Sequence, residues 1–412
     1  MINISEDNLR NLPGLEEISK NEEDIKIYNY LNLGPTHPAT HGIFQNVLKM
    51  DGEVILDAEQ TIGYIHRAFE KLAENRPFYQ ITPITDRMNY CSSPINNIGW
   101  HMTVEKLLGV TTPKRVDYMR VIIMELARIS DHIICNSVIG VDTGALTGFL
   151  YIFQFREKIY EIYEQICGAR LTTNIGRIGG FERDFNPLVI SKIEEILKEF
   201  PKALIEFEKL LIRNRIFMDR TINVGSISGE RALEYGFTGP NLRAAGVDYD
   251  VRVMHPYSSY EDFDFTIPLG TQGDTYDRFC VRQEEMRQSL YIIEQALKNM
   301  PDGDYHADVP EFYLPPKDEV YTTIEGLIWH FKVVYGEIDI PKGQVYHAVE
   351  GGNGELGFYL ISDGGRQPYR LHFRRPCFIY YQAYPEMIKG SLLSDAIITM
   401  SSMNVIAGEL DA

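Results

Sequence analysis

Residues Val116 to Gly140 read VDYMRVIIMELARISDHIICNSVIG, and this stretch decides the fold class. Its apolar residues recur at three- and four-residue spacing, which predicts a helix. Charged residues interrupt it at several points, whereas a membrane-spanning helix needs about 18 consecutive apolar residues. We therefore expect a long helix within a helical bundle of a globular protein, and no segment that crosses a bilayer.

The same spacing predicts further helices on both sides of this stretch. Gly109, Gly140 and Gly168 each follow a predicted helix, as expected for left-handed residues at helix C-termini. Pro201 separates two others, because proline removes a backbone donor. The predicted helices cover residues 65–74, 96–108, 116–139, 146–167, 187–199, 202–220, 277–300 and 391–406.

Short alternating or β-rich segments lie near both ends of the sequence. Asp51-Gly52 joins two of them and is typical of a hairpin turn. The segments cover residues 26–33, 42–50, 53–62, 344–349, 357–362 and 369–373. We therefore predict an α+β fold, with a central helical bundle and small antiparallel sheets formed by the N-terminal and C-terminal segments.

Three regions are predicted along the chain. Residues 1–26 form a polar N-terminal extension, and residues 27–64 a β-rich segment with a histidine-containing loop. Residues 65–412 form the helical bundle with the C-terminal sheet and helix. Within that bundle, residues 223–276 show no clear period but are rich in aromatic side chains, which indicates an ordered irregular insertion.

The composition excludes some functions. Among 412 residues, 58 are acidic and 40 are basic, which gives a formal net charge of -18. An acidic surface would repel nucleic-acid phosphates, so no nucleic acid is expected as a partner. The first 26 residues are rich in Asp and Glu and lack the apolar centre of a signal peptide, so we expect residence on the cytoplasmic side.

The five cysteines are scattered, and no C-x-x-C pair occurs. We therefore expect neither disulfides nor a zinc or iron–sulfur site built by this chain alone. Gly352-Asn-Gly-Glu-Leu-Gly357 matches the glycine pattern of dinucleotide sites. However, a strand and a turn follow it instead of a helix, which indicates a hairpin and no bound cofactor.

Four residues are candidates for acid–base chemistry. His37 and His41 lie in a Pro- and Gly-rich loop and either deliver protons near neutral pH or are solvent-exposed loop histidines. Tyr90, ahead of a predicted helix, either packs with a hydrogen-bond partner or donates a proton. Asp142 either caps a helix N-terminus or orients and stabilises a charged histidine. Local sequence leaves these alternatives open.

Seven motifs in the same order closely resemble the 49 kDa (D) subunit family of respiratory complex I, the NADH:quinone oxidoreductase. They are GPTHPATHG (34–42), IGYIHRAFEK (62–71), DRMNY (86–90), VEKLLG (104–109), DTGAL (142–146), GPNLR (239–243) and GDTYDR (273–278). That family is similar to the large subunit of nickel–iron hydrogenases, which implies a hydrogenase-like fold.

The resemblance also exposes a difference from the hydrogenases, whose metal is held by two C-x-x-C pairs. Where the first pair would stand, this chain has Asn89 and Ser92, with Cys91 out of register, and residues 391–411 contain no cysteine. A nickel–iron site requires soft thiolate ligands, so none is expected. The pocket is left for another substrate.

The resemblance implies a quinone-binding core subunit of a proton-translocating complex. The quinone head group would sit beside the terminal [4Fe–4S] cluster of a partner subunit, while NADH is oxidised elsewhere in the complex. Tyr90 and His41 would bind the two quinone carbonyls, and Asp142 would pair with His41 and hold it protonated. His37 would line the same chamber, and Arg87 would lie near the cluster.

The implied partners are the B, C, I and H subunits of the same complex and a membrane quinone. The chain would be a peripheral subunit on the cytoplasmic side of a bacterial inner membrane, with no cofactor of its own. Two alternatives remain. One is a redox-silent scaffold that joins the cluster subunit to the membrane arm, and the other is the equivalent subunit of a ferredoxin-driven complex.

Thr172 departs from the family pattern, because many members carry a histidine there, close to the cluster. Threonine cannot titrate in its place. We therefore expect the cluster potential to depend little on pH and to be lower, which would suit a low-potential quinone such as menaquinone.

Overall fold

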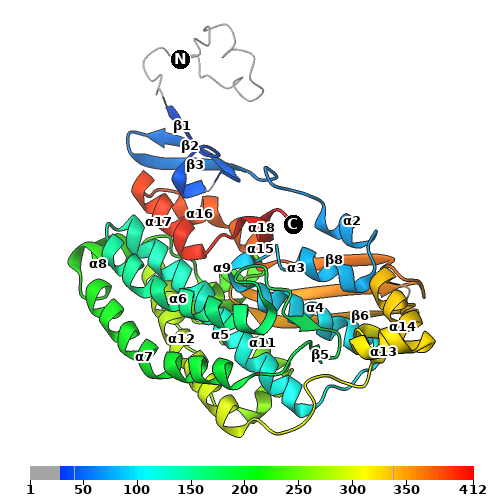
Figure 1. Ribbon diagram of the computed structural model, residues 1–412. Helices are drawn as coiled ribbons and strands as arrows, with labels where there is room; N and C mark the ends of the chain where they lie inside the picture. Colours follow the sequence, from blue (N-terminus) through cyan, green and yellow to red (C-terminus); the bar gives the residue numbers. More distant parts are fainter. Residues whose placement is uncertain (1–27, 41, 337) are drawn as a thin grey trace, which may run out of the picture.

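The computed structural model describes residues 28–40, 42–336 and 338–412. Figure 1 shows a body of helices with one three-stranded sheet on its side, and a second three-stranded sheet at the N-terminal end of the body. Both sheets are antiparallel. The predicted α+β class with small antiparallel sheets from both ends of the sequence is therefore confirmed.

Helix α5 (Lys114–Asp142) lies at the centre of the body. Every side chain from Val121 to Ile133 is buried, which is expected only for a helix covered on all sides. The helices packed against it are α4 (Ser93–Leu108), α6 (Leu146–Cys167), α12 (Thr275–Asn299) and α17 (Leu393–Met403). Among the helices of the described ranges, none has the length and apolarity to cross a bilayer.

The predicted end of this helix at Gly140 is wrong. Helix α5 continues to Asp142, and the first left-handed glycine after it is Gly144. Gly140 keeps helical geometry and lies where a Cβ would contact the Leu211 side chain at 3.5 Å. By contrast, Gly109 and Gly168 do end α4 and α6 in the left-handed conformation, as predicted.

The predicted break at Pro201 is also wrong. Helix α7 runs without interruption from Pro187 to Leu211. An interior proline costs about 3 kcal/mol, but Phe200, Leu204 and Phe207 are buried along one face of this helix on both sides of the proline. Their burial outweighs that cost. A separate short helix, α8 (Arg215–Thr221), follows.

The N-terminal sheet pairs β1 (Asn29–Leu33), β2 (Gln45–Asp51) and β3 (Val54–Thr61) in sequence order. The hairpin predicted at Asp51-Gly52 joins β2 to β3, with Gly52 at a positive φ of 62°. The sheet is fastened to the C-terminal part of the chain, because Ile55 N–H donates to the Ser391 carbonyl at 2.9 Å.

The C-terminal sheet pairs β6 (Gly343–Gly351), β7 (Gly354–Ser362) and β8 (Arg370–Arg374). Gly352 and Asn353 form the turn between β6 and β7, so the hairpin interpretation of the glycine pattern is confirmed. Helix α4 covers the sheet closely: a Cβ on Gly99 would lie 2.9 Å from Val349.

The remaining elements are short. The irregular insertion contains several brief helices and no strand among residues 223–276, all of which are described, as the missing periodicity predicted. The other elements are α2 (Phe69–Ala73), α3 (Thr82–Thr85), β4 (Gly176–Arg177), β5 (Gly180–Phe181), α9 (Gly229–Glu234), α10 (Gly239–Ala244), α11 (Val251–Met254), α13 (Lys317–Thr322), α14 (Ile324–Tyr335), α15 (Pro376–Tyr381), α16 (Tyr384–Ile388) and α18 (Ala407–Leu410).

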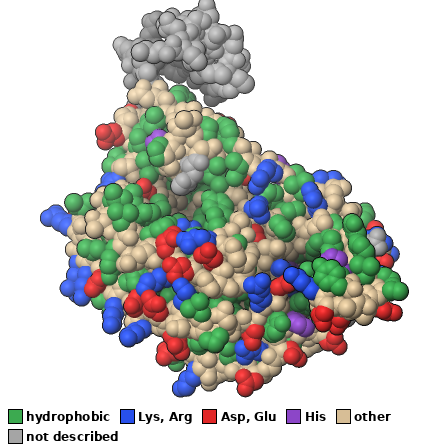
Figure 2. Space-filling model, viewed as in Figure 1, with side chains coloured by type: hydrophobic (Ala, Val, Ile, Leu, Met, Phe, Trp, Pro, Cys, Tyr) green, Lys and Arg blue, Asp and Glu red, His purple; other side chains and the backbone are tan. Residues whose placement is uncertain are grey.

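Helices α13 and α14 carry an exposed apolar surface, which we call the α14 face. Figure 2 shows hydrophobic side chains gathered there, at the right of the molecule. Its members include Tyr321, Ile324 and Tyr335, which are 84%, 73% and 67% exposed. Exposed apolar surfaces of this kind mark interaction sites in soluble proteins.

Candidate functional site

Tyr90 lines a cavity of about 230 Å³ where five parts of the chain meet. We call it the Tyr90 cavity. Its wall is formed by the loop before β2, the turn at Tyr90, and helices α5, α6 and α17 with the residues that follow α17. The lining residues are Ala39, Phe44, Tyr90, Cys91, Ile134, Cys135, Val138, Arg156, Met400, Ser401, Asn404, Val405 and Ile406.

The position of Tyr90 is set by a single 3₁₀ turn, η3 (Tyr90–Ser92), which leads into α4. Asn89 begins this turn, and its side-chain oxygen accepts from Cys91 N–H at 3.1 Å. Tyr90 is half-buried, and burial raises the pKa of its phenol, so the hydroxyl is protonated at neutral pH. No hydrogen bond joins that hydroxyl to any residue that the structure describes. Its proton can therefore be offered to a ligand.

A buried carboxylate lies behind Tyr90. Asp131 Oδ2 accepts from Asn89 Nδ2 at 2.7 Å and from Ser92 Oγ at 2.9 Å, and Oδ1 accepts from Asn404 Nδ2 at 2.7 Å. Asn89 and Ser92 stand where the hydrogenase pattern would place thiolate ligands, and here they bind a carboxylate instead. No group of three or more His, Cys, Asp or Glu suited to a metal occurs in the described ranges.

Asp142 lies beside this cavity. It is the exposed last residue of α5, and Ser401, which lines the cavity, donates a hydrogen bond to its Oδ2. The interpretation of Asp142 as a helix N-cap is wrong, since the N-cap residue of α6 is Ala145. Residues 143–145 separate Asp142 from α6, and its carboxylate is bound instead by a hydroxyl of α17.

The loop that carries the two predicted histidines reaches the same cavity through Ala39. His37 is half-buried, and its Nδ1 accepts from Ala39 N–H at 3.1 Å. His37 therefore shapes the loop beside the cavity wall. His41 lies outside the described residues.

Arg87 and Thr172 are not in the Tyr90 cavity. Arg87 is exposed, donates to the Pro83 carbonyl at 2.6 Å, and lines a separate hollow of about 600 Å³ together with Arg67 and Arg76. Thr172 lies in the loop after α6 with a positive φ of 50°. The loop is held near Arg87 because Asn174 N–H, two residues on, donates to Asp86 Oδ2 at 2.8 Å.

Asp86 has an unusual environment. It is fully buried, and burial raises the pKa of its carboxyl to about 6, although hydrogen bonds from Asn97 and Asn174 and the charges of Arg87 and Arg177 act in the opposite direction. Its ionised form is therefore costly in the folded protein.

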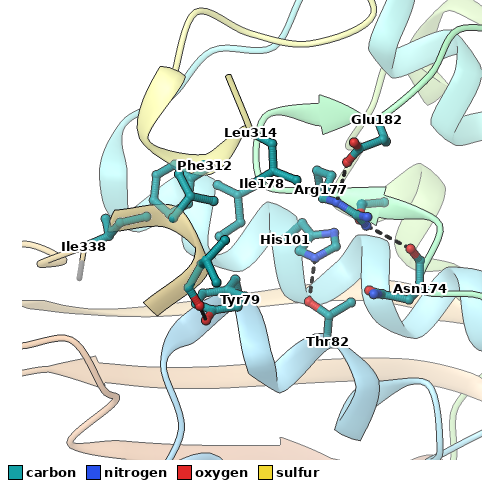
Figure 3. Close-up of a pocket in the computed structure, with 13 residues that line it drawn as sticks. Tyr79, Thr82, His101, Asn174, Arg177, Ile178, Glu182, Phe312, Leu314 and Ile338 are labelled. Atoms are coloured by element: carbon teal, nitrogen blue, oxygen red, sulfur yellow. Dashed lines mark hydrogen bonds and ion pairs between the residues drawn. The ribbon is translucent and has the colours of Figure 1, made fainter. Parts of the chain in front are cut away.

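A third cavity, of about 340 Å³, was not indicated by the sequence (Figure 3). His101 lies at its base and exchanges a 2.8 Å hydrogen bond between Nε2 and Thr82 Oγ1. Burial lowers the pKa of His101, so the ring is neutral, and its Nδ1 has no partner in the described part of the chain. Arg177 and Glu182 pair at 3.1 Å on the opposite wall.

Arg156 is a lining residue of the Tyr90 cavity that sequence reasoning missed. It belongs to α6 and lies over the rings of Phe153 and Tyr160, with its guanidinium carbon 4.9 and 4.6 Å from their centroids. These rings precede and follow it by three and four residues, which places all three on one helix face. That aromatic spacing is the signal that could have identified it.

Comparisons with known proteins identify the family. Residues 142–412 match the family described as the 49 Kd subunit of respiratory-chain NADH dehydrogenase. A protein of Flavobacterium johnsoniae, named as the D subunit of NADH-quinone oxidoreductase, is 74% identical over 394 residues, which cover 95% of this chain and 96% of that protein. A protein of the same name from Cytophaga hutchinsonii is 72% identical over 93% of this chain and 98% of its own length, and one from Leptospira biflexa 58% over 92% and 94%. The chain therefore belongs to the 49 kDa subunit family of the respiratory-chain NADH dehydrogenase.

Proposed function

We propose that this chain is the quinone-binding core subunit of a proton-translocating NADH:quinone oxidoreductase, and that the Tyr90 cavity receives the quinone head group. The observation that carries the proposal is a neutral phenol that faces a largely apolar cavity without a partner among the described residues. Relatives named as the D subunit of NADH-quinone oxidoreductase support the overall activity.

The cavity suits a ring more than a whole quinone. Its volume of about 230 Å³ lies below the range of roughly 300–1,000 Å³ found for drug-sized ligands. A head group would enter it while an isoprenoid tail stayed outside. The wall residues Ile134, Val138 and Met400 supply apolar contact, and the Tyr90 hydroxyl supplies one oriented donor.

Quinone reduction takes up two electrons and two protons. The electrons come from NADH through a [4Fe–4S] cluster of a partner subunit, near Arg87 and Thr172. Tyr90 donates a hydrogen bond to one quinone carbonyl and provides a proton as that oxygen becomes negative. His41 serves the second carbonyl, Asp142 keeps it charged, and His37 supports their loop. Loss of that charge would unbalance Asp142 and signal to the proton-pumping membrane arm.

We further propose the B, C, I and H subunits of the complex as partners, and a peripheral position on the cytoplasmic side of a bacterial inner membrane. The α14 face, with exposed Tyr321 and Ile324, and the exposed Arg87 hollow both support assembly with other subunits. A likeness to hydrogenase large subunits, with the metal ligands lost, is part of the same proposal.

The test is Tyr90→Phe in the intact complex, because it removes one hydroxyl and little packing. NADH:quinone turnover should fall about 10²-fold, while NADH oxidation by an artificial acceptor stays at the wild-type rate. Tyr359→Phe is the matched control, since its hydroxyl donates only to Gln344 at 3.0 Å on an exposed sheet face. Unchanged quinone turnover in Tyr90→Phe would instead favour a redox-silent scaffold.

The electron donor is tested separately. A complex purified through this chain should contain an NADH-oxidising module. A ferredoxin-binding module in its place would assign the chain to a ferredoxin-driven complex and leave the quinone site untouched.

A further inference from the structure

Arg156 carries a charge that nothing in the described part of the chain neutralises directly. No carboxylate of a described residue lies within the 4.0 Å of an ion pair, and Nε, although buried, has no hydrogen-bond partner there. The neighbouring carboxylate on α6, Glu157, pairs with Arg170 instead. A guanidinium that lacks a carboxylate partner in a half-buried position is costly, so its retention needs a reason.

The other buried arginines of this protein are treated differently. Arg120 pairs with Glu105 at 2.5 Å, Arg243 with Glu285 at 2.8 Å, and Arg252 with Asp250 at 2.7 Å. Each of these arginines is at most 2% exposed in its side chain. Arg156 differs from these three, and it lines the Tyr90 cavity.

The side chain is also held in place. Phe153 and Tyr160 lie at 4.9 and 4.6 Å from the guanidinium carbon and provide two cation–π contacts from the same helix. Such contacts orient the planar group without neutralising it or using its N–H donors. The donors remain available toward the cavity.

The charges around the cavity define what Arg156 opposes. Asp131 lies behind Tyr90, and Asp142 reaches the cavity wall through Ser401. Burial, Cys91, Cys377 and Asp131 raise the pKa of the Tyr90 phenol, whereas Arg156 is the cation that lowers it. Arg156 thus acts on the group that is to release a proton, from within the same cavity.

We propose that Arg156 stabilises the negative charge that the quinone oxygens acquire during reduction, by donating hydrogen bonds to one of them. This inference rests on the proposed function of the Tyr90 cavity. Two electrons from NADH and two protons convert two carbonyls into two hydroxyls; Tyr90 releases one proton, and Arg156 keeps its own. The guanidinium offsets the charge that is present whenever electrons arrive before protons.

The test compares Arg156→Met, which keeps the length and apolar contact without charge, with Arg156→Lys, which restores the charge. In the intact complex, Arg156→Met should lower kcat for quinone reduction about 10²-fold, with a smaller change in KM, because charge develops mainly in the transition state. Arg156→Lys should recover most of the loss. Arg170→Met, which removes an exposed arginine beyond the same helix, is the matched control and should retain wild-type turnover.

A series of quinones separates charge from packing. The loss in Arg156→Met should be larger for low-potential quinones, whose reduced oxygens are the more basic, than for high-potential ones. Equal loss with every quinone, in proportion to poorer assembly, would overturn the inference, as would wild-type turnover in Arg156→Met while Tyr90→Phe is inactive. If Tyr90→Phe is fully active as well, the quinone site itself is misassigned.

Discussion

Arg243 and Glu285 lie in direct contact inside the protein: Arg243 Nε donates to Glu285 Oε1 at 2.9 Å, and both side chains are at most 1% exposed. Arg243 also donates to Glu350 Oε1 at 2.8 Å and lies 3.3 Å from Asp250. One guanidinium therefore joins helix α12, strand β6 and the segment before α11.

Removal of this guanidinium should destabilise the whole fold. Arg243→Met leaves Glu285 and Glu350 buried without their main cation, which costs about 3–5 kcal/mol. Arg231→Met is the control, because Arg231 pairs with Glu386 at the surface and should cost at most about 1 kcal/mol. Denaturant unfolding of the full-length chain measures both. Equal midpoints for the two variants would contradict the prediction.

Asp86 should make stability depend on pH. Its pKa is raised by burial from 3.8 to about 6, so the folded state favours the protonated form. The associated stability is present below about pH 4 and is lost as pH rises through 6, and two pKa units correspond to about 3 kcal/mol. Asp86→Asn should therefore gain stability relative to wild type by about that amount between pH 4 and pH 8.

The measurement is the unfolding midpoint of both chains across that pH range. Asp219→Asn, at an exposed position that pairs only with Arg215, serves as the control and should follow the wild-type curve. A constant difference between Asp86→Asn and wild type would show that the folded-state pKa is not raised.

Two glycines with nearly the same backbone angle should respond differently to alanine. Gly109 (φ 69°) has nothing within 4 Å of the position that a Cβ would take, so Gly109→Ala should cost only the left-handed strain of about 1–2 kcal/mol. Gly239 (φ 70°) would place its Cβ 2.6 Å from Gly354 N, and the overlap should add about 1–3 kcal/mol. Denaturant midpoints that rank Gly109→Ala as the worse variant would contradict this.

Thr172 provides a test of the proposed cluster environment. Its positive φ of 50° is unfavourable for a β-branched residue and better tolerated by histidine, so Thr172→His should fold. In the intact complex, the wild-type cluster potential should vary little with pH, and Thr172→His should introduce a dependence of up to about 59 mV per pH unit. Redox titrations at several pH values measure the slope. A wild-type slope of that full size would refute the prediction.

Much of the fold could be predicted from local patterns. The apolar spacing predicted α4, α5, α6 and α12, and glycines marked the ends of α4 and α6, because these signals depend on neighbours within one or two turns. The errors at Gly140 and Pro201 have the opposite origin. There, packing by Leu211 and by the buried face of α7 outweighs the local preference, and such contacts come from distant parts of the chain.

The candidate site divides in the same way. Tyr90, His37, Arg87, Thr172 and Asp142 could be named only through ordered motifs, since their local contexts were ambiguous. The structure lines the cavity with Tyr90 and sets Asp142 beside it through Ser401, but places Arg87 at a separate hollow.

The sequence by itself determined the helices, the two hairpins and the absence of closely spaced thiolates, because each of these is a property of residues near one another in the chain. Only the tertiary structure decided that Asn89, Ser92 and Asn404 would enclose Asp131, and that Arg156 would share a cavity with Tyr90. These residues come from segments up to 315 positions apart (404 − 89). Their meeting depends on how helices α5, α6 and α17 pack, which no local pattern specifies.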